Sequence, residues 1–443
     1  MYKLDTLVFE NGERYPILIG DDGMPHFYST LYVTVKIRSS LAVNTIENRL
    51  KAILWLFEWE KENNRCLVSE FEQGAFLSIE DIISLKDHLK INVSEQKKLK
   101  QGKARFSRKV FSFEDSPKII TTIASVSRDH HYNRMTSVAE YLDFIATATN
   151  QYRNDPNTTN TIDKMTKTIK KERPKGKGKN VTDEIDENTL PDGLLDEFID
   201  IAKPENPLNP FKNSIVKKRN YLIFRLIKET GIRRGEVLSL KITNLDLSTD
   251  KSSIWVSRGH DDKFDPRRRQ PVSKTKERRL PIKNETAELL DSYILTERAE
   301  TLNANQHPYV FITHRKCETQ GQPISTSYFD NEIIPKMKAT DERFSIIHAH
   351  IFRHGWNEGF SEKVDLANEL RAHALAEGKA SPPPISPDEE AKMRQQLMGH
   401  SSEKSGDIYN KRYIRKQANK VALEEQKELQ EQINYSASSN LTG

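Results

Sequence analysis

The sequence predicts a mainly α-helical protein that carries a small antiparallel β-sheet, and three observations indicate this fold class. Apolar residues recur at helical spacing over several long windows, residues 46–57 among them. Short apolar runs at residues 254–256 and 280–282 are typical of strands. A stretch rich in Lys, Gly and Pro at residues 173–179 divides the chain and indicates more than one domain.

The first part of the chain changes its period near residue 36. Residues 1–35 alternate weakly around turn residues, so we expect a strand-rich N-terminal arm there. Residues 36–160 show helical spacing, and Ser78 with Asp81 three positions later predicts a capped helix start. We therefore expect residues 36–160 to form a small helical domain, followed by a basic flexible linker over residues 161–190.

The second part, residues 191–420, predicts a mixed domain. A helix face ends at Gly231, and the two short strands and a buried extended segment at residues 309–313 follow. Near the end, Ser386 and Glu389 form a capping box that starts a helix, which Gly399 ends. Residues 421–443 are expected to be a C-terminal tail.

Composition limits the class of protein. No apolar run is long enough for a transmembrane helix, and the first residues lack the layout of a signal peptide. Cys66 and Cys317 match no metal or disulfide pattern, so we expect a reducing cytoplasm. The net charge of +5 is modest, but cations are concentrated in three runs, at residues 97–109, 164–179 and 267–279. Such runs are either solvated loops or surfaces that attract DNA phosphates.

Basic and aromatic residues recur in an informative order. Arg233 follows Thr-Gly-Ile and precedes Arg-Gly-Glu; His350 and Arg353 are three positions apart; His400 follows Met-Gly; Tyr409 follows nine positions later (409 − 400). This order resembles that of the tyrosine recombinases, the phage integrase family of DNA strand-exchange enzymes. The resemblance implies a helical core-binding domain and a catalytic domain that clamp duplex DNA between them.

The chemistry explains why such residues belong together. Guanidinium groups match phosphate oxygens and stay charged, so Arg233 and Arg353 are the expected transition-state clamps. The resemblance implies that His350 manages the tyrosine proton, that His400 binds a non-bridging oxygen and that Tyr409 is the nucleophile. Tyr413 lies on the same helical face as Tyr409 and is its rival.

Other assignments stay open. By resemblance, the lysine that protonates the leaving 5′-oxygen is Lys274, with Lys276 as the alternative, in a basic hairpin expected to be mobile. His350 and His354, four positions apart, are also compatible with a metal pair, with Glu358 as a loose third ligand. Arg353 and His400 are 47 positions apart (400 − 353), longer than is usual in the family, so we expect an inserted surface loop.

The sequence therefore predicts a site-specific recombinase that cuts and rejoins DNA through a 3′-phosphotyrosine intermediate, for integration or excision of a mobile element. It is expected to need no metal or other cofactor. Its expected partners are double-stranded DNA, a homotetramer on two DNA sites and possible accessory proteins, with no membrane, at a cytoplasmic, nucleoid-associated location. The alternatives are a type IB topoisomerase, which shares this chemistry, and a non-catalytic DNA-binding relative.

Overall fold

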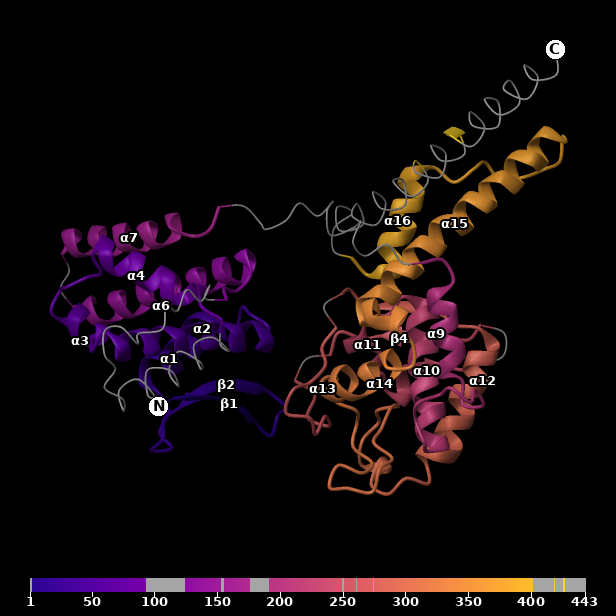
Figure 1. Ribbon diagram of the computed structural model, residues 1–443, viewed down its shortest axis with the longest axis horizontal. Coiled ribbons are helices and arrows are strands. Elements are labelled where there is room, and N and C mark those ends of the chain that lie inside the picture. The colour runs from indigo at the N-terminus through magenta and orange to yellow at the C-terminus, as the bar shows by residue number, and fades with distance from the viewer. Residues whose placement is uncertain are drawn as a thin grey trace, which may run out of the picture. The chain divides into compact units, whose positions relative to one another are not determined.

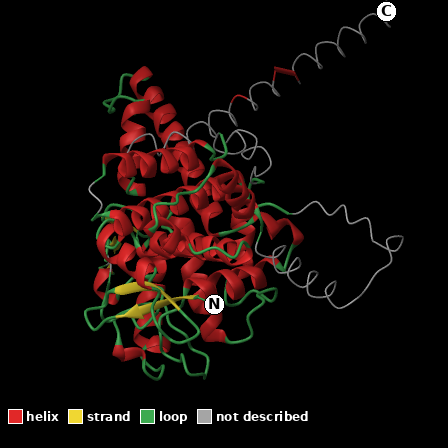
Figure 2. Cartoon of the chain, turned by 90° about the vertical axis from the view of Figure 1, so that its left-hand side faces the viewer, coloured by secondary structure: helices red, strands yellow, loops and turns green. Residues whose placement is uncertain are grey.

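The computed structural model describes residues 2–92, 124–152, 155–175, 191–248, 251–259, 261–273 and 275–400, together with residues 418, 425 and 426. The chain divides into two compact units, Met1–Phe9 with Arg14–Glu184, and Glu10–Glu13 with Ile185–Gly443. Helices dominate the described residues and strands are few, which confirms the predicted fold class (Figure 2). Among these residues, no helix is both long enough and apolar enough to cross a membrane.

The first unit combines one hairpin with a set of helices. In chain order its elements are β1 (Lys3–Val8), β2 (Arg14–Ile19), α1 (Phe27–Tyr32), a π-helical turn (Val33–Ile37), α2 (Val43–Glu62), α3 (Leu67–Glu72), α4 (Ile79–Lys90), α6 (Arg128–Asn150) and α7 (Pro156–Lys171). β1 and β2 pair antiparallel. The helices α2, α3, α4 and α6 bury their apolar faces in one core.

Two predicted boundaries in this unit need revision. The strands expected over residues 1–35 are present, but Leu18 of β2 is fully buried in the core that the helices share, so the hairpin is no separate arm. The linker expected from residue 161 is wrong for its first part, because α7 continues to Lys171. Asp155 caps this helix, and Ile162 and Ile169 pack into the core, so burial of an apolar stripe overrides the basic composition.

The second unit is larger and mixed. Its elements are α9 (Leu194–Ala202), α10 (Ser214–Thr230), α11 (Arg234–Leu238), a 3₁₀ turn (Ile242–Asn244), β3 (Leu245–Asp246), β4 (Ser253–Val256), β5 (Arg278–Pro281), α12 (Asn284–Tyr293), a π-helical turn (Ile294–Arg298), a 3₁₀ turn (Ala304–Gln306), α13 (Thr326–Tyr328), a π-helical turn (Phe329–Ile333), α14 (Ile334–Lys338), a 3₁₀ turn (Glu342–Ile346), α15 (Ala349–Ala376) and α16 (Pro387–Met398).

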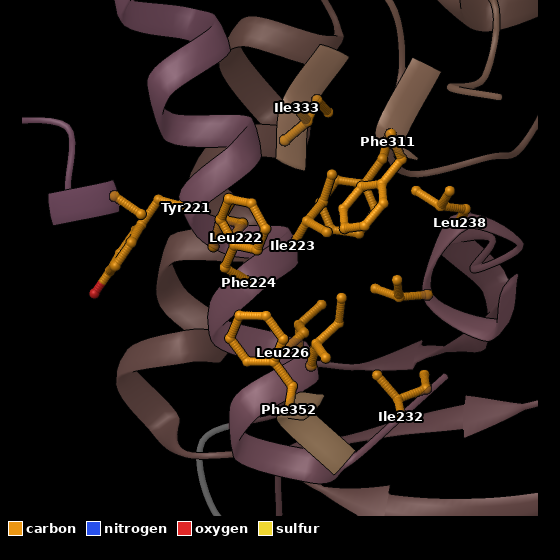
Figure 3. Packing of buried hydrophobic residues seen from close by; sticks show 14 of the residues in the cluster. Tyr221, Leu222, Ile223, Phe224, Leu226, Ile232, Leu238, Phe311, Ile333 and Phe352 are labelled. Atoms are coloured by element: carbon orange, nitrogen blue, oxygen red, sulfur yellow. The ribbon is translucent and has the colours of Figure 1, made fainter. Parts of the chain in front are cut away.

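A small sheet and a central helix organise this unit. β3, β4 and β5 form an antiparallel sheet in that order, with Ile254 opposite Leu280. α10 packs against α9, α12 and α15, and its apolar residues point into the core around Phe224 and Phe352, whose rings are stacked 6.0 Å apart (Figure 3). Because α10 is held on several sides, its C-terminus is a fixed point from which the next residues are positioned.

The long interval between Arg353 and His400 is mostly helix. α15 runs for 28 residues to Ala376 and extends away from the rest of its unit (Figure 1). The predicted surface loop is thus limited to about the stretch between α15 and α16, where Ile385 exchanges two hydrogen bonds with Asn368. Residues of high helix propensity continue α15 beyond Arg353, so most of the extra length folds as helix rather than as a loop.

The segment between β4 and β5 was expected to be a mobile basic hairpin, but its described residues are anchored. Arg267 is buried, pairs with Asp265 at 2.8 Å and donates to the carbonyls of Leu238 and Ile324. Arg278 is buried as well. Two members of the third basic run therefore hold the protein together instead of facing solvent.

Candidate active site

Arg233 lies at the turn between α10 and α11. Gly231 ends α10 with φ of 62°, and Arg233 adopts an extended conformation as the first cap of α11. Its backbone N–H donates to the Glu236 carboxylate at 3.1 Å. Its Nη1 lies 3.6 Å from Glu236 Oε1 and is buried without a hydrogen bond to the described residues. The side chain keeps 30% exposure, so part of this cation faces solvent. The next residue, Arg234, pairs with Asp330 instead.

Arg353 comes from the second turn of α15 and is almost completely buried, with 1% exposure. Its Nη1 donates to the carbonyl of Gly231 and its Nη2 to the carbonyl of Met398, each at 2.8 Å. This guanidinium therefore joins the end of α10 to the end of α16. Its positive charge is buried within the site, and hydrogen bonds to backbone carbonyls fix its position.

His400 follows α16, whose start and end match the prediction. Ser386 and Glu389 form the capping box, and Gly399 ends the helix with φ of 64°. The imidazole is 7% exposed, and its Nε2 lies 3.1 Å from Arg353 Nη2. Because a guanidinium only donates, Nε2 accepts and the ring proton is assigned to Nδ1.

Burial, followed by the positive charges of Arg353, Arg233 and Arg278, lowers the pKa of His400 to about 4. His400 is therefore neutral at neutral pH. A neutral imidazole that accepts a hydrogen bond at Nε2 is a donor at Nδ1–H.

His350 lies in the first turn of α15, one turn before Arg353. Partial burial of the ring, followed by the charges of Arg353, His348 and Arg233, lowers its pKa. His350 is thus a neutral imidazole at the exposed edge of the site, able to accept a proton. Its ring meets that of His354 edge to face, 4.7 Å between centroids. Within the described ranges no group of three potential metal ligands gathers here or elsewhere.

Glu236 is the buried anion of this site, with 1% exposure. Burial by itself raises the pKa of a carboxyl group, but the charge and hydrogen bond of Arg278, with hydrogen bonds from Thr275 and the Arg233 backbone, lower the pKa of Glu236 to about 2. Glu236 accepts a hydrogen bond from the Arg233 backbone, and it pairs with the side chain of Arg278 at 2.8 Å.

The sequence did not single out Arg278, because it stands in a basic run where nothing local distinguishes a buried arginine from an exposed one. Two of the predicted catalytic residues, Lys274 and Tyr409, lie outside the described residues, as does the rival Tyr413. Lys276 is exposed, and its backbone N–H donates to the carbonyl of Gly399 at 3.0 Å. The structure therefore brings together Arg233, Arg353, His350 and His400, four of the six predicted site residues.

This arrangement combines two cations, two neutral imidazoles and one neutralising carboxylate, drawn from three separate segments of the chain. A model of the phage integrase family matches residues 202–374, which include Arg233 and Arg353. Residues 202–374 are thus similar to this family, the tyrosine recombinases.

Relatives at the sequence level are transposases. Transposase A from transposon Tn554 of Staphylococcus aureus strain Mu50 is 30% identical over 153 residues, which cover 33% of this chain and 39% of the transposase. The same protein from strain N315 gives the same values. The match thus spans well under half of the length of these relatives.

Among solved structures, the Tn1549 transposon integrase in complex with transposon right end DNA is 15% identical, with a TM-score of 0.43 over 89% of this chain and 99% of that chain. XerH site-specific recombinase bound to difH substrate is 16% identical, with a TM-score of 0.37 over 86% of this chain and 89% of that chain. Similarity at this level supports no argument about how this chain acts.

Proposed function

We propose that this protein is a site-specific DNA recombinase of a mobile element, which cleaves duplex DNA through a covalent bond to Tyr409. The observation that carries the proposal is the meeting of Arg233, Arg353, His350 and His400 in one site of a chain whose residues 202–374 match the phage integrase family. Two guanidinium groups and two neutral imidazoles are suited to a phosphodiester whose negative charge increases in the transition state.

In the proposed first step the Tyr409 oxygen attacks the scissile phosphorus. The phenol has an ordinary pKa of about 10, so it must lose its proton as the bond forms. His350 is neutral at physiological pH and accepts that proton. Arg233, whose Nη1 makes no hydrogen bond with the described residues, compensates the charge on the non-bridging oxygens, and His400 donates Nδ1–H to them.

The same step breaks the bond between phosphorus and the 5′-oxygen. That oxygen leaves as a hydroxyl once Lys274 gives it a proton, with Lys276 as the alternative donor. The product is a 3′-phosphotyrosine and a free 5′-hydroxyl. In the second step the 5′-hydroxyl of a partner strand attacks the phosphorus of this phosphotyrosine and returns its proton to the lysine. The bond between phosphorus and Tyr409 breaks, and His350 returns its proton to the phenolic oxygen. The phosphoester bond energy is kept, so the proposal requires neither a metal ion nor a nucleotide.

The partners follow from this chemistry and from the family. Exchange between two duplexes needs a reactive tyrosine on each of four strands, so we propose a homotetramer on two DNA sites, with accessory proteins where direction must be set. We propose that both units, each with its own apolar core, bind the duplex.

The test is covalent capture of DNA in the absence of divalent ions. The purified protein is incubated in EDTA with a library of duplexes nicked near random sites and then denatured. DNA that stays attached is sequenced. We expect attachment at a 3′-phosphate within one short sequence, because the site's own cations replace the role of a metal.

The other outcomes discriminate among alternatives. Strict dependence of cleavage on a divalent ion would contradict the proposal and favour a metal at His350 and His354. Attachment at unrelated sequences would favour a type IB topoisomerase. DNA binding without any attachment would favour a non-catalytic relative.

A further inference from the structure

Arg278, the first residue of β5, is a buried side chain that joins three segments of the chain near the site. It is 5% exposed. Its Nε donates to the carbonyl of Leu397 at 2.7 Å, its Nη1 to Thr275 Oγ1 at 2.6 Å and its Nη2 to Glu236 Oε2 at 2.8 Å. These three partners belong to three different parts of the chain. Leu397 lies at the end of α16, Thr275 lies in the segment before β5, and Glu236 lies in α11.

Glu236 extends this network towards the catalytic arginine. The carboxylate accepts hydrogen bonds from the hydroxyls of Ser273 and Thr275, at 3.2 and 2.6 Å, and from the backbone N–H of Arg233. One buried anion therefore fixes the start of α11, where Arg233 stands, together with the chain on both sides of residue 274.

The other end of the network holds the residue before His400. The Lys276 N–H donates to the Gly399 carbonyl at 3.0 Å. A Cβ on Gly399 would lie 2.9 Å from Arg278 Nη1, Lys276 O and Thr275 Cβ, so these groups close around a glycine. The close contact leaves little freedom for the backbone that delivers His400.

Stability alone does not explain this ion pair. Replacing a buried pair by apolar residues is often neutral or stabilising, because the cost of removing both charges from water offsets their attraction. Three hydrogen bonds to three different segments instead define relative positions, since a planar guanidinium fits only one arrangement of its acceptors. Arg353 joins the ends of α10 and α16 from another direction, through Gly231 and Met398.

We propose that Arg278 is a positioning residue for strand cleavage. It holds α11, the segment before β5 and the end of α16 in one frame, so that Arg233 and His400 address the same phosphate. This inference rests on the proposed function. It assigns Arg278 no contact with DNA, and it predicts a defect in the rate of the chemical step rather than in DNA affinity or in folding.

The test compares Arg278→Lys with wild type in a single-turnover experiment. Lysine keeps the positive charge but cannot reach three acceptors in the fork of a guanidinium. We measure the rate of covalent attachment at saturating DNA, the Kd for DNA and the fraction of folded protein from thermal melting. The expected result is a rate lower by about 10²-fold, because small misplacements of reacting groups cost that much, with Kd unchanged. Thr275→Val, which loses only the hydroxyl between Arg278 and Glu236, should show a smaller loss of the same kind.

Arg298→Lys is the matched control. Arg298 is also 5% exposed and donates to three backbone carbonyls, those of Tyr309, Ala304 and His307, but none of these belongs to the site. The control reports what the loss of a buried guanidinium does to folding. Its folded fraction should react at the wild-type rate. An Arg278→Lys variant whose folded fraction also reacts at the wild-type rate would overturn the inference.

A substrate with sulfur in place of the 5′-oxygen distinguishes the positioning of Arg233 and His400 from protonation of the leaving group. A 5′-bridging phosphorothioate leaves without protonation, so it should restore cleavage by Lys274→Ala. It should not restore Arg278→Lys, because Arg233 and His400 are displaced as well. If the sulfur substrate fully restored cleavage by Arg278→Lys, the proposed positioning of Arg233 and His400 would be contradicted. Arg278 would then act only through the lysine that protonates the leaving oxygen. The failure of the proposed function and the failure of this inference are distinguishable. If the wild type does not become attached to DNA, the proposed function fails. If wild type and Arg278→Lys become attached at equal rates, only the role of Arg278 is removed.

Discussion

At the residue scale, the site shows how the same side-chain type takes different roles. Arg233 keeps part of its guanidinium exposed, Arg353 bonds two backbone carbonyls and an imidazole, and Arg278 pairs with Glu236. The order of these residues along the chain indicated the first two, through motif spacing. Which arginine is exposed and which is buried depends on acceptors from distant segments, and a sequence of cations does not contain that information.

The neutral state of His400 leads to a pH prediction. Its folded-state pKa is about 4, below the usual value of about 6.5, so the unfolded chain takes up a proton first as the pH falls. The free energy of unfolding should therefore decrease between pH 6.5 and 4, by at most about 3 kcal/mol from this residue. Urea unfolding at a series of pH values measures it, and His400→Gln should show a smaller decrease than wild type.

His373→Gln serves as the control for this experiment, because His373 is an exposed histidine of α15. Its pH dependence of stability should match wild type. An equally steep decrease in His400→Gln and in wild type would show that His400 is not held neutral by the fold.

At the element scale, the sequence predicted those features that depend on residues close together in the chain. The caps of α4 and α16 and the glycine after α10 all appear where their residue types predicted them. These features depend on neighbours within one turn, so a short window contains the cause. The course of the chain between β4 and β5 was not predictable in this way, because Arg267 and Arg278 find partners in other elements.

Gly231 gives a prediction about such an element boundary. It has a left-handed backbone, and a Cβ there would lie 2.9 Å from the Trp356 ring and from Met398 Cε. Gly231→Ala should thus combine a backbone cost of about 1–2 kcal/mol with overpacking of roughly 1–3 kcal/mol. Chemical denaturation measures the sum. Gly378→Ala is the control, since Gly378 also has positive φ at a helix end but open space around it. Equal losses in the two variants would refute the packing part.

At the scale of the whole molecule, the chain builds two separate apolar cores, one in each unit. The fold class and the presence of two units follow from periodicity and composition. The extent of each unit did not, as α7 shows: its Ile162 and Ile169 recur at helical spacing, but the surrounding lysines masked that signal. α15 likewise continues into the interval where the sequence predicts an inserted surface loop.

The central claim is that Tyr409 is the nucleophile of a DNA recombinase. The most direct measurement is covalent attachment to a nicked DNA substrate carrying the captured sequence, for wild type, Tyr409→Phe and Tyr413→Phe. Losing one phenolic oxygen removes the bond-forming atom but little ground-state binding, so Tyr409→Phe should bind this DNA with unchanged Kd and form no adduct, whereas Tyr413→Phe should form it. An adduct with Tyr409→Phe, and none with Tyr413→Phe, would contradict the account.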